Sequence, residues 1–275
     1  MKPAEYDTLH REISLPVVRV RAGTAGGSGT VIYSKPDEGG EHSTYVLTNH
    51  HVVDNMIKIE ERWDPMLQRN AKRDVRGIPT CEFFEYRWQS RAVGASAVEA
   101  DIEAYDKDED LALLRLRSGR PPMAVAKLYP RDGEHELRVG MGVYCVGAGL
   151  GEPPVMTGGF LSQFGREIEH KEFWLNTAPA IFGNSGGALF LADSHEFIGV
   201  PARIAVIALG FSADAITHLQ YAIPISRVYG FLETQCYRFV YDISYSEKGE
   251  EAERKRRLEA DRLRLMSEEV REGAA

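Results

Sequence analysis

The sequence predicts an all-β protein that ends in a charged α-helix. From Val17 to Leu209, short β-branched and aromatic runs alternate with turn residues, and little helical periodicity is present. Many short strands separated by turns favour β-barrels or a sandwich. By contrast, residues 247–272 are dense in Glu, Lys and Arg around a narrow apolar stripe, which is typical of a solvated helix. At 275 residues the chain is long enough for one large all-β domain or two small ones.

Each strand is predicted from a short apolar or β-branched run bounded by turn residues. The expected strands are 17–20, 30–33, 45–48, 81–88, 97–105, 111–116, 139–146, 155–164, 172–176, 188–191 and 197–209. The glycine-rich segment 23–29 separates the first two runs. Residues 61–77 are charged and lack clean periodicity, so they are predicted to be an excursion. Residues 118–122, Ser-Gly-Arg-Pro-Pro, form the best linker because proline cannot join a central ladder.

Composition excludes several classes of protein. A net charge of −8 argues against nucleic acid as a partner. The three cysteines, Cys81, Cys145 and Cys236, are too few for a disulfide framework and suit a reducing compartment. No Cys-x-x-Cys pair is present, so a zinc or redox site of that type is not expected. No metal and no other cofactor are predicted. The chain has no signal-like run and no apolar stretch of about 18 residues, which predicts a cytoplasmic protein with no membrane partner.

Three motifs occur in an order that suggests acyl-transfer chemistry. They are Thr48-Asn49-His50-His51-Val52-Val53, Asp110-Leu111-Ala112-Leu113-Leu114 and Gly183-Asn184-Ser185-Gly186-Gly187. A serine hydroxyl becomes a good nucleophile when an imidazole takes its proton, and a carboxylate holds that imidazole in the right tautomer. Glycines beside the serine let a substrate carbonyl approach backbone N–H groups, here those of Gly183 and Ser185.

The Gly-x-Ser-x-Gly pattern around Ser185 also matches the nucleophile elbow of α/β-hydrolases. That elbow requires a helix after the serine, and then an acid and a histidine. Asp193 or Asp214, with His218, would supply the last two. The strand-like run 188–191 argues against this alternative, as does the lack of alternating strands and helices.

The three motifs resemble those of trypsin-like serine peptidases, most closely the HtrA/DegP-like branch without a PDZ domain. The segments Gly27–Ile32, Thr157–Ser162 and Tyr221–Pro224 are similar to further family motifs. The resemblance implies a chymotrypsin-like pair of six-stranded antiparallel β-barrels. It also implies a catalytic triad of His51, Asp110 and Ser185. The implied oxyanion hole consists of the N–H groups of Gly183 and Ser185. His51 is preferred to His50 because Val52-Val53 must follow the base directly. Asp110 is preferred to Asp106 and Asp108 because it directly precedes the apolar strand.

The resemblance also predicts four regions in the chain. Residues 1–117 form the barrel with the histidine and the acid, 118–137 the linker, 138–235 the barrel with the serine, and 236–275 a helical extension. Protein or peptide substrates are expected, and the terminal helix is a candidate for self-association or for binding a protein partner. The alternative function is a catalytically silent or conditionally active trypsin-fold binding or scaffold module. Ile181-Phe182 replaces the Asn-Pro that is more typical of the family, which leaves the resting geometry of the oxyanion loop open.

The resemblance places the substrate pocket between three segments. The predicted wall residues are Thr177, Ala178, Pro179, Ala180, Ile181, Val200, Pro201, Ala202, Arg203 and Ala222. No acid lies in residues 177–180, which disfavours cleavage after Lys or Arg because a buried cation needs a carboxylate. A small or medium apolar residue before the scissile bond is expected, with selection of an acid by Arg203 as the alternative. Pro201 removes one backbone donor from the strand expected to pair with substrate.

Overall fold

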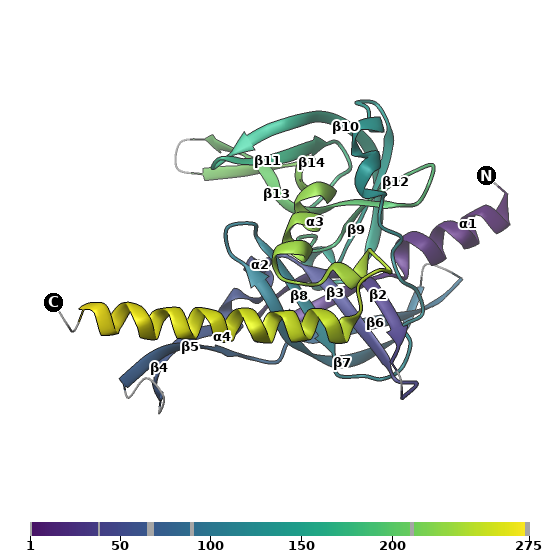
Figure 1. Ribbon diagram of the computed structural model, residues 1–275. Coiled ribbons are helices and arrows are strands. Elements are labelled where there is room, and N and C mark those ends of the chain that lie inside the picture. Colours follow the sequence, from purple (N-terminus) through teal and green to yellow (C-terminus); the bar gives the residue numbers. More distant parts are fainter. Residues whose placement is uncertain (1, 38, 65–68, 89–90, 210–211, 273–275) are drawn as a thin grey trace. The chain divides into compact units, whose positions relative to one another are not determined.

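The computed structural model describes residues 2–37, 39–64, 69–88, 91–209 and 212–272 (Figure 1). The chain divides into two compact units. The first comprises residues 1–57 and 76–229, and the second comprises residues 58–75 and 230–275. The three predicted motifs all fall in the first unit.

Six antiparallel strands close the first barrel in the order β1-β2-β3-β8-β7-β6. They are β1 (Val17–Ala22), β2 (Ala25–Pro36), β3 (His42–Thr48), β6 (Thr80–Arg87), β7 (Arg91–Asp106) and β8 (Leu111–Leu116). Strand β8 reads as a continuous apolar run because Leu111 to Leu114 are all fully buried. The glycine-rich segment differs from the prediction, since β2 already begins at Ala25 and pairs with β1 from there.

Six more strands close the second barrel in the order β10-β11-β14-β13-β12-β9. They are β9 (Gly142–Gly147), β10 (Val155–Ile168), β11 (Lys171–Asn176), β12 (Ala188–Leu191), β13 (Phe197–Leu209) and β14 (Ser212–Pro224). All neighbours in this barrel are antiparallel. The predicted pair of six-stranded antiparallel barrels is therefore confirmed. Strand β14 contains the family-like segment Tyr221–Pro224 at its end and begins at Ser212, in a region where no strand was expected.

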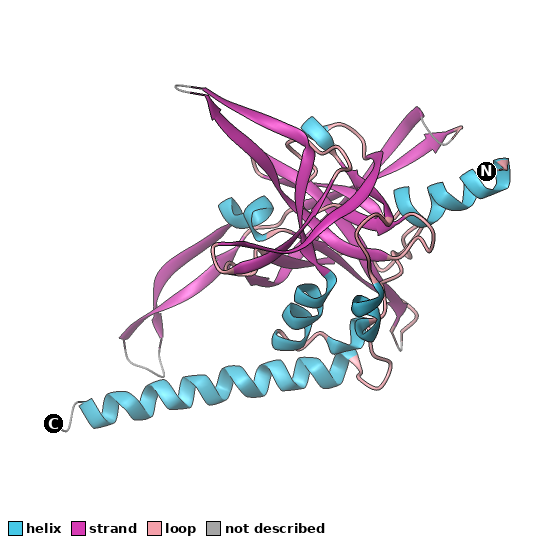
Figure 2. Ribbon diagram, turned by 90° about the horizontal axis from the view of Figure 1, so that it is seen from above, coloured by secondary structure: helices cyan, strands magenta, loops and turns pink. Residues whose placement is uncertain are grey.

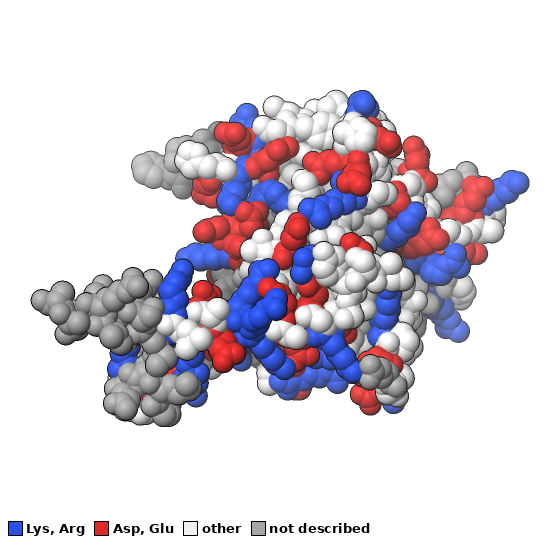
Figure 3. All heavy atoms as spheres, in the orientation of Figure 1, with Lys and Arg blue, Asp and Glu red and all other residues white. Residues whose placement is uncertain are grey.

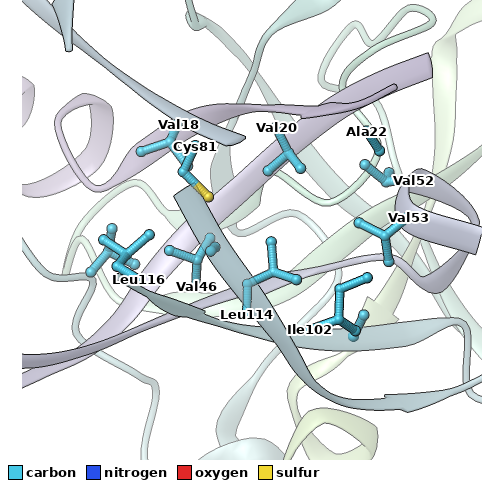
Figure 4. Close-up of a cluster of buried hydrophobic side chains, with 13 residues drawn as sticks. Val18, Val20, Ala22, Val46, Val52, Val53, Cys81, Ile102, Leu114 and Leu116 are labelled. Carbon is cyan, nitrogen blue, oxygen red and sulfur yellow. The ribbon is translucent and has the colours of Figure 1, made fainter. Parts of the chain in front are cut away.

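The core of the first barrel holds a short helix in place. Helix α2 (His50–Val53) follows β3 directly and buries Val52 and Val53. Figure 4 shows these two side chains in the same cluster as Val20 and Ile102. Cys81 lies in that cluster too, and burial raises the pKa of its thiol to about 12. The buried valines fix the helix, so the preceding histidines lie at its exposed end.

The segment between the barrels is hydrogen-bonded to both of them. The N–H of Ala126 donates to the carbonyl of Val31 in β2, and the N–H of Tyr129 donates to the carbonyl of Phe197 in β13. The N–H of Phe197 in turn donates to the carbonyl of Lys127. This segment thus links the two barrels through backbone hydrogen bonds as well as through chain connectivity. The four-region division of the chain remains a prediction.

Two further helices, besides α2, were not expected from the sequence. Helix α1 (Pro3–Leu9) continues into a π-helical turn (His10–Ser14), and helix α3 (Ile225–Thr234) begins directly after β14. Only Leu9 and Ile13 of the N-terminal segment are buried, so its apolar pattern is weak. Among the described residues no helix is long and apolar enough to cross a membrane. Acidic and basic side chains are interspersed on the face shown in Figure 3.

The second unit contains the excursion and the predicted C-terminal helix. Strands β4 (Ile57–Asp64) and β5 (Arg69–Arg76) form a separate two-stranded sheet, visible as a long hairpin in Figure 2. Residues 61–64 and 69–76 of the predicted excursion therefore lie in strands. Helix α4 (Glu247–Glu272) confirms the predicted helix, and its Arg262 pairs with Asp64 at 2.6 Å. Its apolar residues Leu258 and Leu263 are exposed.

Candidate active site

His51 and His50 have different surroundings at the start of α2. The His51 side chain is 44% exposed, and its Nδ1 lies 2.9 Å from Oδ2 and 3.0 Å from Oδ1 of Asp110. The His50 ring instead lies 5.3 Å from the Tyr105 ring, and burial lowers its pKa. Because Nδ1 of His51 faces a carboxylate, it carries the ring proton and leaves Nε2 as a proton acceptor.

Asp110 is held in a tight turn between β7 and β8. Its φ of +53° is in the left-handed region, which Asp tolerates better than most residues. The side-chain amide of Asn49 donates to its carbonyl at 2.8 Å, and the backbone N–H of His51 donates to its carboxylate at 3.0 Å. The carboxylate therefore fixes both the backbone and the ring of His51. Asp106 accepts N–H bonds within the turn, and Asp108 is exposed.

Ser185 lies in a loop that the first barrel supports. The N–H of Ser28 in β2 donates to the carbonyl of Ser185 at 2.8 Å. The N–H of Gly186 donates to the carbonyl of Pro201 at 3.1 Å. A side chain at Gly186 would put its Cβ 2.3 Å from the Ser28 carbonyl, so only glycine fits this turn. The Ser185 Oγ is 3.5 Å from the carbonyl of Ala202. Strand β12 follows the loop, which excludes the nucleophile elbow because that elbow requires a helix.

Two backbone N–H groups beside Ser185 have no hydrogen-bond partner among the described residues. The N–H groups of Asn184, Gly186 and Gly187 all donate to carbonyls, whereas those of Gly183 and Ser185 donate to no described residue. The carbonyl of Phe182 accepts the N–H of Leu150 at 2.7 Å, and this peptide is trans. Peptide planarity therefore turns the Gly183 N–H away from Leu150. The unusual Ile181-Phe182 pair leaves both N–H groups available to a ligand.

A cavity of about 290 Å³ adjoins Ser185. Besides His51 and Ser185, it is lined by Ala180, Ile181, Phe182, Asn184, Pro201, Ala202, Arg203, Ile204 and Gln220. Five of the predicted wall residues are thus present. Thr177, Ala178, Pro179, Val200 and Ala222 do not line it, and Ala178, Val200 and Ala222 are fully buried in the barrel. Phe182, Asn184, Ile204 and Gln220 were not predicted to line the cavity, although Asn184 belongs to the serine motif and Phe182 directly precedes it.

The base of this cavity is polar but uncharged. Gln220, which is 1% exposed, donates to the side-chain carbonyl of Asn176 at 2.8 Å and accepts from the Cys145 thiol at 3.6 Å. Burial raises the pKa of Cys145 to about 11, so this thiol stays protonated at neutral pH. No acid lines the cavity among the described residues. No described cluster of His, Cys, Asp or Glu is arranged to hold a metal ion.

Arg203 is held at the rim of the cavity by its neighbours. Its guanidinium donates to Glu169 at 2.6 Å and lies 5.4 Å from the centre of the Phe173 ring. Pro201 lacks an N–H, but its carbonyl is already bonded to Gly186. The carbonyl of Ala202, which faces Ser185, is the strand's acceptor nearest the nucleophile. The loss of one donor at Pro201 from the strand expected to pair with substrate stays a prediction.

The model of the trypsin-like peptidase domain family matches residues 27–200, which include both barrels' motifs. The chain belongs to this family. A probable serine protease do-like protein from Buchnera aphidicola is 30% identical over 68% of this chain and 32% of its own length. The periplasmic serine endoprotease DegP of Escherichia coli K12 is 29% identical over 68% of this chain and 32% of its own length. The chain thus spans about a third of the length of these relatives.

Solved structures share the fold of this trypsin-like domain. A serine endoprotease from Yersinia pestis has a TM-score of 0.56 and 20% identity, covering 85% of this chain and 67% of that one. The HtrA-type protease AlgW with tripeptide has a TM-score of 0.58 and 18% identity, covering 85% of this chain and 64% of that one. The predicted resemblance to the HtrA/DegP-like branch is confirmed.

Glu109 directly precedes Asp110 and links the turn that carries Asp110 to the second barrel of the trypsin-like domain. Its carboxylate accepts from Arg227 at 2.7 Å and pairs with Lys171, and Arg227 also donates to the Glu109 carbonyl at 3.1 Å. Arg227 in turn lies 5.0 Å from the centre of the Phe173 ring. Burial disfavours the ionised carboxylate, but the hydrogen bonds from Lys171 and Arg227 outweigh it, so the pKa of Glu109 lies below its ordinary value.

This pairing predicts a pH-dependent contribution to stability. Because its folded-state pKa is lowered, Glu109 stabilises the fold fully above the unfolded glutamate pKa of about 4.3, and this contribution is lost as pH falls through the folded value. We expect Glu109→Gln to lower the free energy of unfolding by about 1–3 kcal/mol at pH 7. Urea denaturation from pH 7 to pH 3 should show the difference from wild type shrinking below about pH 4.3.

The exposed Glu85 in β6 provides the matched control, because its side chain makes no hydrogen bond to a described residue. Glu85→Gln should change the free energy of unfolding by less than about 0.5 kcal/mol. A pH-independent difference between wild type and Glu109→Gln would contradict the proposed role of the charge.

Proposed function

We propose that this chain is a serine endopeptidase that hydrolyses protein or peptide substrates. One observation supports this most directly. The Asp110 carboxylate receives both the ring and the backbone N–H of His51, while the N–H groups of Gly183 and Ser185 have no partner among the described residues. Base, orienting acid and unused donors thus surround one serine, and the family relationship supports the same chemistry.

In this mechanism, Nε2 of His51 takes the Ser185 proton as Oγ attacks the substrate carbonyl. Asp110 stabilises the resulting imidazolium and keeps Nδ1 protonated. The N–H groups of Gly183 and Ser185 donate to the oxyanion of the tetrahedral intermediate. His51 then protonates the leaving amine, which departs and leaves an acyl-enzyme. A water molecule, deprotonated by His51, hydrolyses the acyl-enzyme and restores Ser185.

The residue before the scissile bond is small or medium-sized and apolar in this proposal. The cavity beside Ser185 has about 290 Å³ and is bordered by Ala180, Ala202 and Ile204. None of the described residues that line it offers a carboxylate to a lysine or arginine side chain. Arg203 is already paired with Glu169, which makes the acid-selecting alternative the weaker one. A peptide library tests this choice, and efficient cleavage after Lys would contradict it.

A fluorophosphonate probe tests the nucleophile itself. The wild-type protein should be labelled, with the adduct mapped by mass spectrometry to Ser185, and Ser185→Ala should not be labelled. A second candidate function, a conditionally active or silent binding module, is favoured by one observation. The Ser185 Oγ bonds to the Ala202 carbonyl and to no described atom of His51. Absence of labelling under all conditions would support this second function.

Ser28 is a positioning residue in the proposed enzyme. It is fully buried in β2, its hydroxyl donates to the carbonyl of Gly183 at 2.6 Å, and it accepts the N–H of Ala148 at 2.7 Å. We expect Ser28→Ala to lower kcat by about 10- to 100-fold, because the Gly183 carbonyl loses its hydrogen bond and the loop between the two oxyanion donors, Gly183 and Ser185, is less firmly held. Cleavage of an apolar reporter peptide measures the effect.

Ser34→Ala is the matched control for this prediction. Ser34 lies in the same strand and also makes two hydrogen bonds, to His42 and Thr44. Both variants should lose about 1–3 kcal/mol of stability, but only Ser28→Ala should lower kcat. Equal kcat values for the two variants would rule out the positioning role.

Two further predictions from the sequence still require experiments. The first is the cytoplasmic location, to be tested by fractionation of cells that produce the protein. The second is the role of helix α4 in binding a partner or a second copy. Removing residues after Tyr245 and comparing mass in solution and fluorophosphonate labelling would test that role.

A further inference from the structure

A second cavity, of about 380 Å³, lies on another side of the nucleophile loop. It is lined by Arg19, Val20, Arg21, Gly23, Thr24, Ala25, Gly26, Gly27, Ala148, Leu150, Gly151, Phe182 and Gly183. Phe182 borders both this cavity and the one described above, so its side chain, 71% exposed, forms a ridge between them. The two cavities are therefore neighbours across the proposed oxyanion loop.

In the proposed mechanism a substrate lies across Ser185, so its two parts, before and after the scissile bond, extend toward different cavities. The acyl part pairs with the strand around Ala202 and fills the cavity with Gln220 at its base. The part of the substrate that follows the scissile bond leaves Ser185 in the direction opposite to the acyl part. Gly183 and the glycines 26 and 27 line the second cavity, which places it beside that departing segment.

Two arginines and no acid line this second cavity among the described residues. Both arginines share the single carboxylate of Glu82, which is only 12% exposed. Burial disfavours ionised Glu82, but the hydrogen bonds from Arg19 and Arg21 outweigh it, so its pKa is lowered and the carboxylate stays charged at neutral pH. Two positive charges against one negative charge leave this group with a net positive charge.

The two arginines differ in how fully they are engaged. Arg19 pairs with Glu82, donates to the carbonyl of Gly151 and lies over the Phe84 ring. Arg21 uses only Nε, which donates to Glu82 at 2.9 Å. Its two terminal nitrogens make no hydrogen bond to a described residue, and its side chain is 58% exposed. Glu82 therefore orients a guanidinium that still has four N–H donors, enough for a second carboxylate.

We propose that this cavity binds an acidic side chain in the first residues after the scissile bond. The carboxylate would accept from the terminal nitrogens of Arg21, while the exposed side chains of Phe182 and Leu150 contact its methylene groups. The inference rests on the proposed function, because it assigns the cavity to the departing part of a substrate. The cavity would thus favour peptides with Glu or Asp after the scissile bond.

Matched peptides test the preference. They share one apolar acyl side and carry Glu, Gln or Lys at the first or second position after the scissile bond. An exposed arginine–carboxylate pair contributes about 0.2–1 kcal/mol, so kcat/KM should be about 1.4- to 5-fold higher for Glu than for Gln, with Lys lowest. Arg21→Gln should bring the Glu/Gln ratio close to one, and Arg21→Lys should keep part of it. For the wild type, about 1 M NaCl should also reduce the ratio.

Arg120→Gln is the control, since Arg120 is exposed and lines none of the cavities beside Ser185. Its Glu/Gln ratio should equal that of the wild type. A parallel measurement uses Ser185→Ala and the same labelled peptides in a binding assay. Tighter binding of the Glu peptide that depends on Arg21 would support the site even if hydrolysis were absent, which would contradict only the proposed function. Equal rates and equal affinities for the Glu and Gln peptides would overturn the inference.

Discussion

His51→Ala is expected to lower kcat/KM by a factor on the order of 10⁴–10⁶. Without the imidazole, Ser185 has no group to take its proton, and the leaving amine has no group to protonate it. The N–H groups of Gly183 and Ser185 remain, so some catalysis above the rate in water is expected to persist. Hydrolysis of an apolar reporter peptide, followed over hours for the variant, measures the loss.

His50→Gln is the control that makes this result specific. His50 is next to His51 on the same short helix, but its ring packs against Tyr105 and makes no hydrogen bond to Asp110. We expect its kcat/KM to fall by less than about tenfold, since Gln can occupy a partly buried position without a charge. Similar losses for the two variants would mean that helix α2, rather than the His51 ring, was being disturbed.

The choice between these two histidines came from the family motif, in which two apolar residues directly follow the base. In the structure Val52 and Val53 are buried, and the His51 ring lies beside Asp110. The strands and the serine loop were predictable from local sequence, since turn residues and apolar runs mark their ends. Gln220 was not predictable, because only closure of the second barrel brings β14 beneath the Ser185 loop.

The hydrogen bonds between residues far apart in the sequence could not be predicted either. Ser28 reads as one residue of a glycine-rich segment, yet its hydroxyl joins Ala148 and Gly183, more than a hundred residues away. The hairpin β4–β5 was missed for a different reason. Most of its side chains are exposed, so its sequence lacks the alternation of a half-buried strand. Burial patterns predict what faces a core, and the polar contacts that position a site leave no such pattern.

Asp110→Asn is expected to lower kcat by about 10⁴-fold with little change in KM. Asn keeps the size of the side chain and tolerates the left-handed backbone at this position, where φ is +53°. When Oδ1 keeps the hydrogen bond from the His51 backbone N–H, the NH2 group of Asn takes the place of Oδ2 and puts a donor against the ring Nδ1. This arrangement favours the imidazole tautomer that carries its proton on Nε2. In that tautomer Nε2 cannot take the proton from Ser185. Steady-state kinetics with the reporter peptide give kcat and KM separately.

Asp108→Asn provides the comparison within the same turn. Asp108 is exposed, and its carboxylate makes no hydrogen bond to a described residue, so its kcat should fall by less than about tenfold. Retention of fold in both variants is checked by thermal unfolding, where a shift in Tm of less than about 2 °C corresponds to a loss of no more than about 1 kcal/mol for a chain of this size. If Asp110→Asn kept more than a tenth of the wild-type kcat, His51 would have to be oriented by its backbone alone. The function of the carboxylate would then be structural, and the assignment of Asp110 as the orienting acid would be wrong.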